Sequence, residues 1–259
     1  MLFFTLAALF VLGAVTASFI GVLVARLNTG GSFLTGRSHC DACGVALSPF
    51  SLVPIVSYLA YAGLARCCGV RLRQTAPATE FLLGCLFALA YMRLGFVLAL
   101  PFMLLSFAAL FALVLYDLMH QVLPPVPLTV FVLASAGTGL LLAPDFVAFG
   151  VSFSVALVLS LSLLFVHLLS GGRAMGFADA PLVFGLALLA GPAALPGFAF
   201  SFWVGAVIGI AMLARRPRGS RMGVEVPFAP FLATGFLLAY FTQWNPFIIT
   251  AISSPTFFQ

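Results

Sequence analysis

Two aspartates at the borders between apolar runs and polar turns are the residues best suited to acid–base chemistry. Asp117 closes an apolar run at about residues 94–116, and Asp179 opens another at about 180–194. An ionised aspartate in the middle of a membrane helix costs about 2.5–3.5 kcal/mol, so such a group is usually functional. Asp179 is the sole carboxylate of the polar island 171–181, which reads Gly-Gly-Arg-Ala-Met-Gly-Phe-Ala-Asp-Ala-Pro. The alternative is that Asp179 caps the next helix, with Pro181 in the first turn.

If the two aspartates meet, their carboxylates can share one proton. Like charges a few Å apart cannot both ionise cheaply, so such a pair titrates as a unit. One carboxylate then acts as general base on a water molecule, while the protonated carboxyl group polarises a peptide carbonyl. This is the chemistry of an aspartic protease. Separate helix caps, or an ion or proton transport site, are the alternative interpretations of Asp117 and Asp179.

Four cysteines between the first two apolar runs form a candidate metal site. Two thiolates at the spacing Cys40-x-x-Cys43 can bind one Zn²⁺. Cys67 and Cys68 are adjacent, and neighbouring residues seldom bind one ion without backbone distortion. The candidate ligands are therefore Cys40, Cys43 and Cys68, with either Cys67 or His39 as the fourth. A reducing cytoplasm favours a structural metal over disulfides, and a packed loop without metal is the alternative.

The composition predicts an all-α polytopic membrane protein, because 63% of the 259 residues are hydrophobic and 7% are charged. The apolar runs predict eight transmembrane helices in a single membrane domain, 1–259. A cysteine-containing loop, 27–77, is inserted between the first and second helices. Within this loop the apolar stretch 50–64 is broken by Pro54 and Gly63, which predicts an interfacial or packed segment. The predicted spans are at about 2–25, 78–92, 94–116, 126–143, 147–169, 180–194, 197–214 and 228–243.

The net charge of +5 comes from eleven arginines without lysine. In a soluble protein this positive charge would suggest a nucleic-acid partner. In a membrane protein it indicates which loops face the cytoplasm, so we predict no nucleic-acid partner. With eight spans, all the arginines except Arg93 fall on one face, which the positive-inside rule makes cytoplasmic. Asp117 and Asp179 lie at this same face. The basic loop 215–221 is expected to contact anionic membrane lipid.

Seven segments, in this order along the chain, resemble motifs of the prepilin peptidases, the type IV prepilin leader peptidases. These are membrane aspartic proteases of the wider GxGD group that includes presenilin. The segments are Ala17–Arg26, Arg37–Gly44, Pro54–Leu59, Cys68–Glu80, Asp117–Pro124, Met175–Asp179 and Pro227–Gly235. The aspartates fall in segments that match D-x-x-x-x-x-L-P-D and M-G-x-G-D.

The resemblance implies that Asp117 and Asp179 are the catalytic pair. It implies as substrates the prepilin or pseudopilin precursors, cut after a short basic leader at the cytoplasmic face of the bacterial inner membrane. Members with the cysteine loop often also methylate the new amino terminus with S-adenosylmethionine. Glu80 matches a family acid and contacts substrate or cofactor, or else stabilises a helix N-terminus by its charge. The sequence makes no prediction of oligomeric state.

The chain departs from the family pattern at four positions. Ala178 replaces the glycine before Asp179, and a Cβ restricts both positive φ and close approach of substrate. Pro181 stands where lysine is usual, Pro125 replaces the aspartate of L-P-D, and Ala65 replaces the first cysteine of a second C-x-x-C. The alternatives to an active peptidase are therefore a catalytically weakened or inactive paralogue and a small ion or proton transporter.

Two histidines lie near the aspartates. His120 either tunes Asp117 or is an exposed loop residue. His167 either lines the site or hydrogen-bonds across helices.

Overall fold

The computed structural model describes residues 1–27, 40, 42–46, 53–72, 74–173, 175–214 and 227–246. These residues are helical or lie in turns, with a bridge pairing Leu64 and Arg71, and no strand occurs among them. The chain forms two compact units, Met1–Leu141 and Leu142–Gln259. The predicted all-α class is confirmed, while the predicted single membrane domain stays a prediction. The candidate ligand His39 and the basic loop 215–221 lie outside the described residues.

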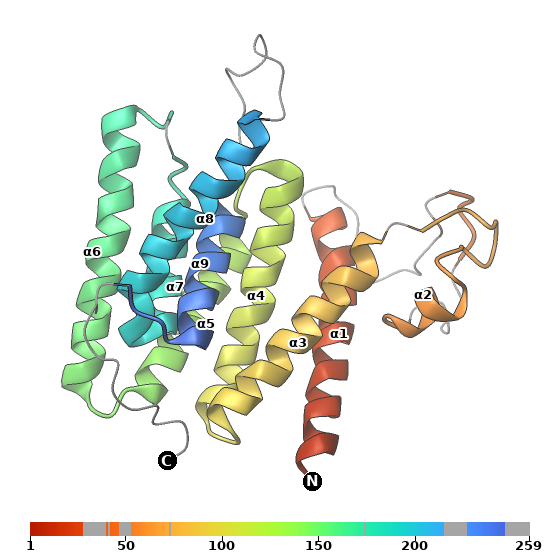
Figure 1. Cartoon of the computed structure of the whole chain (residues 1–259), viewed down its shortest axis with the longest axis horizontal. Helices are drawn as coiled ribbons and strands as arrows, with labels where there is room; N and C mark the ends of the chain where they lie inside the picture. Colours follow the sequence, from red (N-terminus) through yellow and green to blue (C-terminus); the bar gives the residue numbers. More distant parts are fainter. Residues whose placement is uncertain are drawn as a thin grey trace. The chain divides into compact units, whose positions relative to one another are not determined.

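The first unit contains two long helices that pack side by side through glycine. It comprises α1 (Leu2–Arg26), α2 (Val56–Ala60), α3 (Thr75–Leu94), α4 (Ala99–His120) and α5 (Pro125–Leu142) (Figure 1). A Cβ at Gly13 would lie 2.7 Å from the Leu83 carbonyl oxygen, and one at Gly84 would lie 2.8 Å from the Phe10 ring. Small residues of this kind let membrane helices approach closely, so these two glycines bring α1 against α3.

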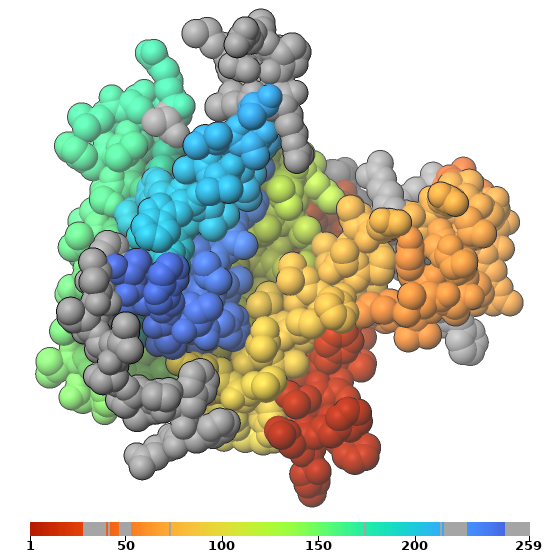
Figure 2. All heavy atoms as spheres, in the orientation of Figure 1, coloured from red at the N-terminus to blue at the C-terminus, as the bar shows by residue number. Residues whose placement is uncertain are grey.

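The cysteine-containing loop, 27–77, here called the cysteine-containing segment, connects α1 to α3 in the sequence. In Figure 2 its orange surface projects beyond α1 and α3, which belong to the same unit. Its one described helix, α2, has five residues, and Val56 and Leu59 on it are 60% and 71% exposed. The apolar stretch predicted at 50–64 therefore does not form a buried helix over its described residues.

The turn that follows Asp117 comes later than predicted. Gly95, at φ 68°, ends α3, so that α4 begins at Ala99. This helix then runs past the expected end at Tyr116 to His120, where Gln121 adopts the left-handed conformation at φ 56°. Pro125 opens α5, a position at which the missing N–H costs nothing. Asp117 therefore lies in the last turn of a helix.

The second unit comprises α6 (Phe146–Ser170), α7 (Asp179–Ala190), the 3₁₀ turn η2 (Gly191–Ala193), α8 (Ala194–Ala214) and α9 (Ala229–Thr242). Asp145 caps α6 by accepting a hydrogen bond of 2.6 Å from the Ala148 N–H. The helical path from Asp179 to Met212 has 34 residues and would be about 50 Å long if straight, against about 30 Å of bilayer core. Gly191, at φ 54°, interrupts it and separates α7 from α8.

Six helical stretches among the described residues are long and apolar enough to cross a membrane. They are Leu2–Arg26, Thr75–Leu94, Ala99–His120, Pro125–Leu142, Phe146–Ser170 and Asp179–Met212. The last stretch includes two of the predicted spans, α7 and α8. α9 is apolar but has 14 residues, so its crossing stays a prediction. The predicted polytopic membrane protein is confirmed, and each of the eight predicted segments corresponds to a helix.

Candidate functional site

The four cysteines come from two turns with the same backbone pattern. In the first, Cys40 N–H donates to Val45 O and Gly44 N–H donates to Cys40 O, at 2.9 and 2.8 Å. In the second, Ala65 N–H donates to Val70 O and Gly69 N–H donates to Ala65 O, both at 2.8 Å. Gly44 and Gly69 have φ values of 70° and 67°, a conformation that favours glycine. Ala65 therefore occupies the backbone position of Cys40, and Cys68 that of Cys43.

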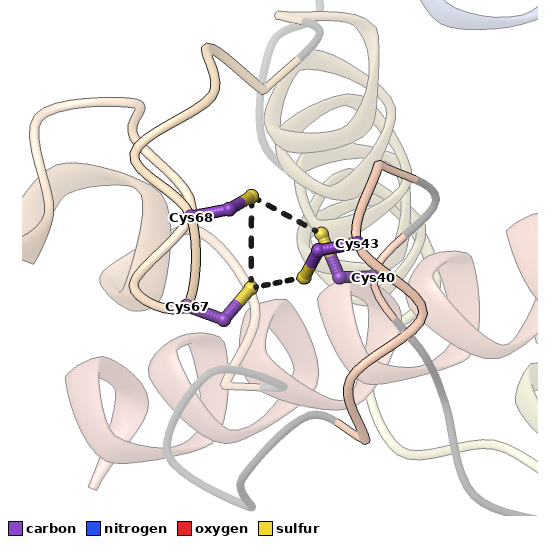
Figure 3. A group of neighbouring side chains, drawn as sticks. All are labelled: Cys40, Cys43, Cys67 and Cys68. Carbon is purple, nitrogen blue, oxygen red and sulfur yellow. Dashed lines mark hydrogen bonds between the residues drawn. The ribbon is translucent and has the colours of Figure 1, made fainter.

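All four sulfurs converge, although the second turn lacks its first cysteine. The Sγ atoms lie within 4.8 Å of one another, and Figure 3 shows them pointing toward a common centre. The Cys40–Cys68 and Cys67–Cys68 sulfur distances are 3.8 Å, and the Cys43–Cys67 distance is 3.2 Å. In a tetrahedral site with bonds of about 2.3 Å, sulfurs are about 3.8 Å apart. The adjacent Cys67 and Cys68 thus have this sulfur spacing, and binding of one ion by both stays a prediction.

The cluster holds one thiol that is readily ionised. Backbone hydrogen bonds from Ala42 and Cys43 lower the pKa of Cys40 from 9.0 to about 6. The neighbouring Cys43 thiol raises the pKa of Cys67 to about 12. A backbone hydrogen bond at Val70 lowers the pKa of Cys68, but desolvation and the Cys40 sulfur outweigh it, so this pKa is raised. At neutral pH, Cys40 is therefore a thiolate beside the protonated thiols of Cys67 and Cys68, and this set of donors fits a thiophilic cation.

Glu80 connects the cysteine-containing segment to α3. Its side chain is buried, and its Oε2 accepts a hydrogen bond of 2.8 Å from the backbone N–H of Ile55. Ile55 precedes α2 and has φ 60°, ψ −49°, which is unfavourable for a β-branched residue. The structure thus gives Glu80 a partner in the protein's own backbone. Its contact with substrate or cofactor stays a prediction.

Asp117 is a buried carboxylate in the last turn of α4. The residue is 6% exposed and follows the buried Tyr116. His120 lies one turn further along the same helix and packs its ring on that of Tyr116, with centroids 4.4 Å apart. His120 itself is exposed. The second predicted catalytic residue, Asp179, belongs to the other unit, so the pairing of Asp117 with Asp179 stays a prediction.

Asp179 is the first residue of α7 and is 7% exposed. It is not the N-cap, because that position belongs to Ala178, which makes no side-chain capping bond. Instead, the Asp179 Oδ2 accepts a hydrogen bond of 3.0 Å from the Gly176 N–H. A Cβ at Gly176 would lie 3.3 Å from this same oxygen. The glycine of the Met-Gly-x-x-Asp segment therefore lets the backbone approach the carboxylate.

Two of the departures from the family pattern cause no backbone strain. Ala178 has φ −71° and ψ −13°, in the right-handed helical region that any L-residue adopts. Pro181 is the third residue of α7, within the first turn, where an N–H has no helical partner to lose. The conformational objection to Ala178 is thus removed. Its effect on approach of a substrate stays a prediction.

Two side chains of α6 hold the turn around Asp179. Ser160 Oγ donates to the Ala180 carbonyl at 2.8 Å, and His167 Nδ1 lies 2.8 Å from the Met175 carbonyl oxygen. The hydrogen bond of His167 thus goes to the loop before α7 and not across helices, and a place for His167 in the site stays a prediction. The role of Ser160 was missed, since nothing in the sequence distinguishes it from the other serines of α6.

The sequence is similar to a peptidase family model and to several prepilin leader peptidase/N-methyltransferases. A family model, the Bacterial Peptidase A24 N-terminal domain, matches residues 11–94, which run from within α1 through the cysteine-containing segment to the end of α3. A prepilin leader peptidase/N-methyltransferase of Bacillus subtilis is 32% identical over 239 residues, which are 91% of this chain and 93% of that protein. Proteins of the same name from Pseudomonas aeruginosa and Dickeya chrysanthemi are 33% and 32% identical, over 76% and 80% of this chain and 68% and 75% of their own lengths. No solved structure matches the chain. This identity across nearly the whole length places the chain in the prepilin leader peptidase/N-methyltransferase family.

Proposed function

We propose that this protein is a membrane aspartic endopeptidase that removes the leader peptide of prepilin- or pseudopilin-like precursors. The observation that carries the proposal is that Asp117 and Asp179 are both buried at helix ends. The chain that holds them is 32% identical to a prepilin leader peptidase/N-methyltransferase over 91% of its length. Buried carboxylates within apolar helices are expensive and are usually functional.

In this proposal, Asp117 and Asp179 act as a pair on the scissile peptide bond. One carboxylate takes a proton from a water molecule, whose oxygen attacks the carbonyl carbon. The other, protonated, carboxyl group donates a hydrogen bond to the carbonyl oxygen. Collapse of the tetrahedral intermediate breaks the C–N bond, and the leaving amine takes up a proton from the pair. The product is a mature chain with a new amino terminus.

An active enzyme is favoured over an inactive paralogue by the local geometry at Asp179. Ala178 is in the right-handed helical region and Pro181 is in the first turn of α7, so neither substitution distorts the element that presents the carboxylate. We place the protein in the bacterial inner membrane with its site at the cytoplasmic face. The positive-inside rule supports this orientation.

We further propose that Cys40, Cys43, Cys67 and Cys68 hold one structural Zn²⁺. Their sulfur spacing and the lowered pKa of Cys40 support this assignment. Zn²⁺ would join two turns that share little apolar core. The relatives' name supports a second activity, methylation of the new amino terminus with S-adenosylmethionine, for which Glu80 is the candidate contact.

Co-expression with a pilin-like precursor encoded near this gene tests the peptidase. The parent should shorten the precursor, whereas Asp117→Asn and Asp179→Asn, which keep the side-chain shape, should each abolish cleavage. Asp145→Asn is the matched control, because asparagine also caps helices well and Asp145 lies at the start of α6. Cleavage that survives either substitution in the pair would contradict the assignment of those residues.

Methylation is tested on the cleaved product by mass spectrometry. Purified protein with S-adenosylmethionine should add the mass of one methyl group to the new amino terminus. Omission of S-adenosylmethionine should leave cleavage intact and remove the added mass. A product that never gains this mass would restrict the function to the peptidase.

A further inference from the structure

One peptide group separates the imidazole of His167 from the carboxylate of Asp179. The Met175 carbonyl oxygen lies 2.8 Å from His167 Nδ1, and the Gly176 N–H donates to Asp179 Oδ2 at 3.0 Å. This carbonyl and this N–H belong to the same peptide bond, which is planar and rigid. Tilting the plane at one end therefore moves the hydrogen-bond donor at the other.

The chemistry of the contact fixes the proton on His167. A carbonyl oxygen only accepts hydrogen bonds, so Nδ1 must carry a proton and donate it. The hydrogen bond at the carbonyl polarises the peptide group and strengthens the N–H as a donor to Asp179.

The loop also contacts His167, which is half-buried. The Gly172 N–H donates to the His167 carbonyl at 2.9 Å, and Gly172 has φ 79°, which favours glycine. A Cβ at Gly172 would lie 3.4 Å from the ring carbon Cε1. The Phe177 ring and the imidazole form a T-shaped pair, with centroids 5.9 Å apart and planes at 69°. His167 thus contacts the loop at Gly172, Met175 and Phe177, before and after the peptide that bonds Asp179.

We propose that His167 is a positioning residue for catalysis: it orients the Met175–Gly176 peptide and, through that peptide, the carboxylate of Asp179. The inference rests on the proposed peptidase function. His167 does not touch the substrate in this arrangement. Its effect is expected on the chemical step, because displacement of a catalytic group by about 1 Å can cost about a hundredfold in rate.

Three substitutions of His167 test the proposal, and they are compared for kcat and KM on a purified precursor. His167→Asn places an amide donor where Nδ1 stands, so it can still bond the Met175 carbonyl. His167→Gln extends its amide toward the Nε2 position, and His167→Leu keeps bulk without a donor. We expect His167→Leu and His167→Gln to lower kcat about 10- to 100-fold with KM unchanged, and His167→Asn to recover most of the loss. An unchanged kcat in His167→Leu, or no recovery in His167→Asn, would overturn the proposal.

A second measurement does not depend on activity. Amide hydrogen exchange of a peptide that contains residues 175–178 should be faster in His167→Leu than in the parent, and slow again in His167→Asn. Equal exchange in the three proteins would overturn the positioning role even if no precursor were cleaved. Failure of the peptidase proposal is seen separately, as absence of cleavage by both the parent and Asp145→Asn.

Discussion

The Glu80 carboxylate and the Ile55 backbone N–H are 2.8 Å apart, and this hydrogen bond joins a buried side chain of α3 to a residue at φ 60°. Such a backbone conformation costs about 1–3 kcal/mol for a residue other than glycine, so surrounding contacts must maintain it. Glu80 is therefore expected to hold the cysteine-containing segment in place, which gives the first prediction.

Glu80→Leu should loosen the segment, while Glu80→Gln, which keeps an acceptor oxygen, should behave like the parent. A buried donor left without a partner costs about 1–3 kcal/mol, so the exposed thiols Cys43 and Cys67 should react faster with a thiol reagent in metal-free Glu80→Leu. Reaction rates that are the same in both variants would contradict this role. Loss of methylation with unchanged thiol reactivity would instead support contact with S-adenosylmethionine.

The two cysteine turns share a backbone pattern, so we expect a cysteine at position 65 to replace Cys67 as a zinc ligand. Cys67→Ser should lower the bound Zn²⁺ after purification, because structural zinc normally has four ligands. Adding Ala65→Cys should restore it, since Ala65 is buried and occupies the backbone position of Cys40. Elemental analysis provides the measurement, with Cys85→Ser on α3 as the control. No restoration by Ala65→Cys would show that the two turns are not equivalent as metal-binding sites.

Zinc affinity should rise with pH. Cys67, with a pKa raised to about 12, and Cys68, with a raised pKa, must lose protons when metal binds. Cys40, with a pKa of about 6, competes with protons only below that pH. Each proton released raises the affinity about tenfold per pH unit, so the protons of Cys67 and Cys68 alone give about a hundredfold between pH 7 and 8. Competition with a chromophoric chelator at several pH values measures this slope, and a flat profile would exclude a thiol site.

Two single substitutions beside Asp179, Ala178→Gly and Gly176→Ala, are expected to differ in their effect on the cleavage rate. Ala178→Gly should leave cleavage near the parental rate, because Ala178 is unstrained at φ −71°. Gly176→Ala should lower the rate, because its Cβ would stand 3.3 Å from Asp179 Oδ2. Precursor cleavage measures both effects. A marked gain in Ala178→Gly would show that the Ala178 methyl group obstructs the substrate.

The contact between α8 and α9 should tolerate no side chain at Gly235. A Cβ there would overlap the backbone nitrogen and Oγ of Ser201, which itself bonds the Leu232 carbonyl at 3.2 Å. Gly235→Ala should therefore destabilise the protein by about 1–3 kcal/mol or more. Thermal unfolding in detergent measures the loss. Gly209→Ala on α8, where a Cβ would have open space, should cause little change.

Apolar runs were sufficient to predict the helices, because backbone groups in lipid must be satisfied within the segment itself. The position of Asp117 within α4 was not predicted, since the helix continues until Gln121 takes a left-handed conformation. The contacts of Asp179 were also missed. Its carboxylate bonds Gly176 in the loop behind it, and such a bond depends on the path of a short turn that periodicity does not describe.

The paired turns have a consequence for how such sites are recognised. The hydrogen bonds and positive-φ glycine of the turn at 65–70 persist although the C-x-x-C spacing does not. A search for two C-x-x-C motifs would find only the first turn. Cys67, two residues after Ala65, nevertheless brings its sulfur into the cluster. The shape of the two turns brings the four sulfurs together, and we expect the cluster to form with its fourth cysteine at either position 65 or position 67.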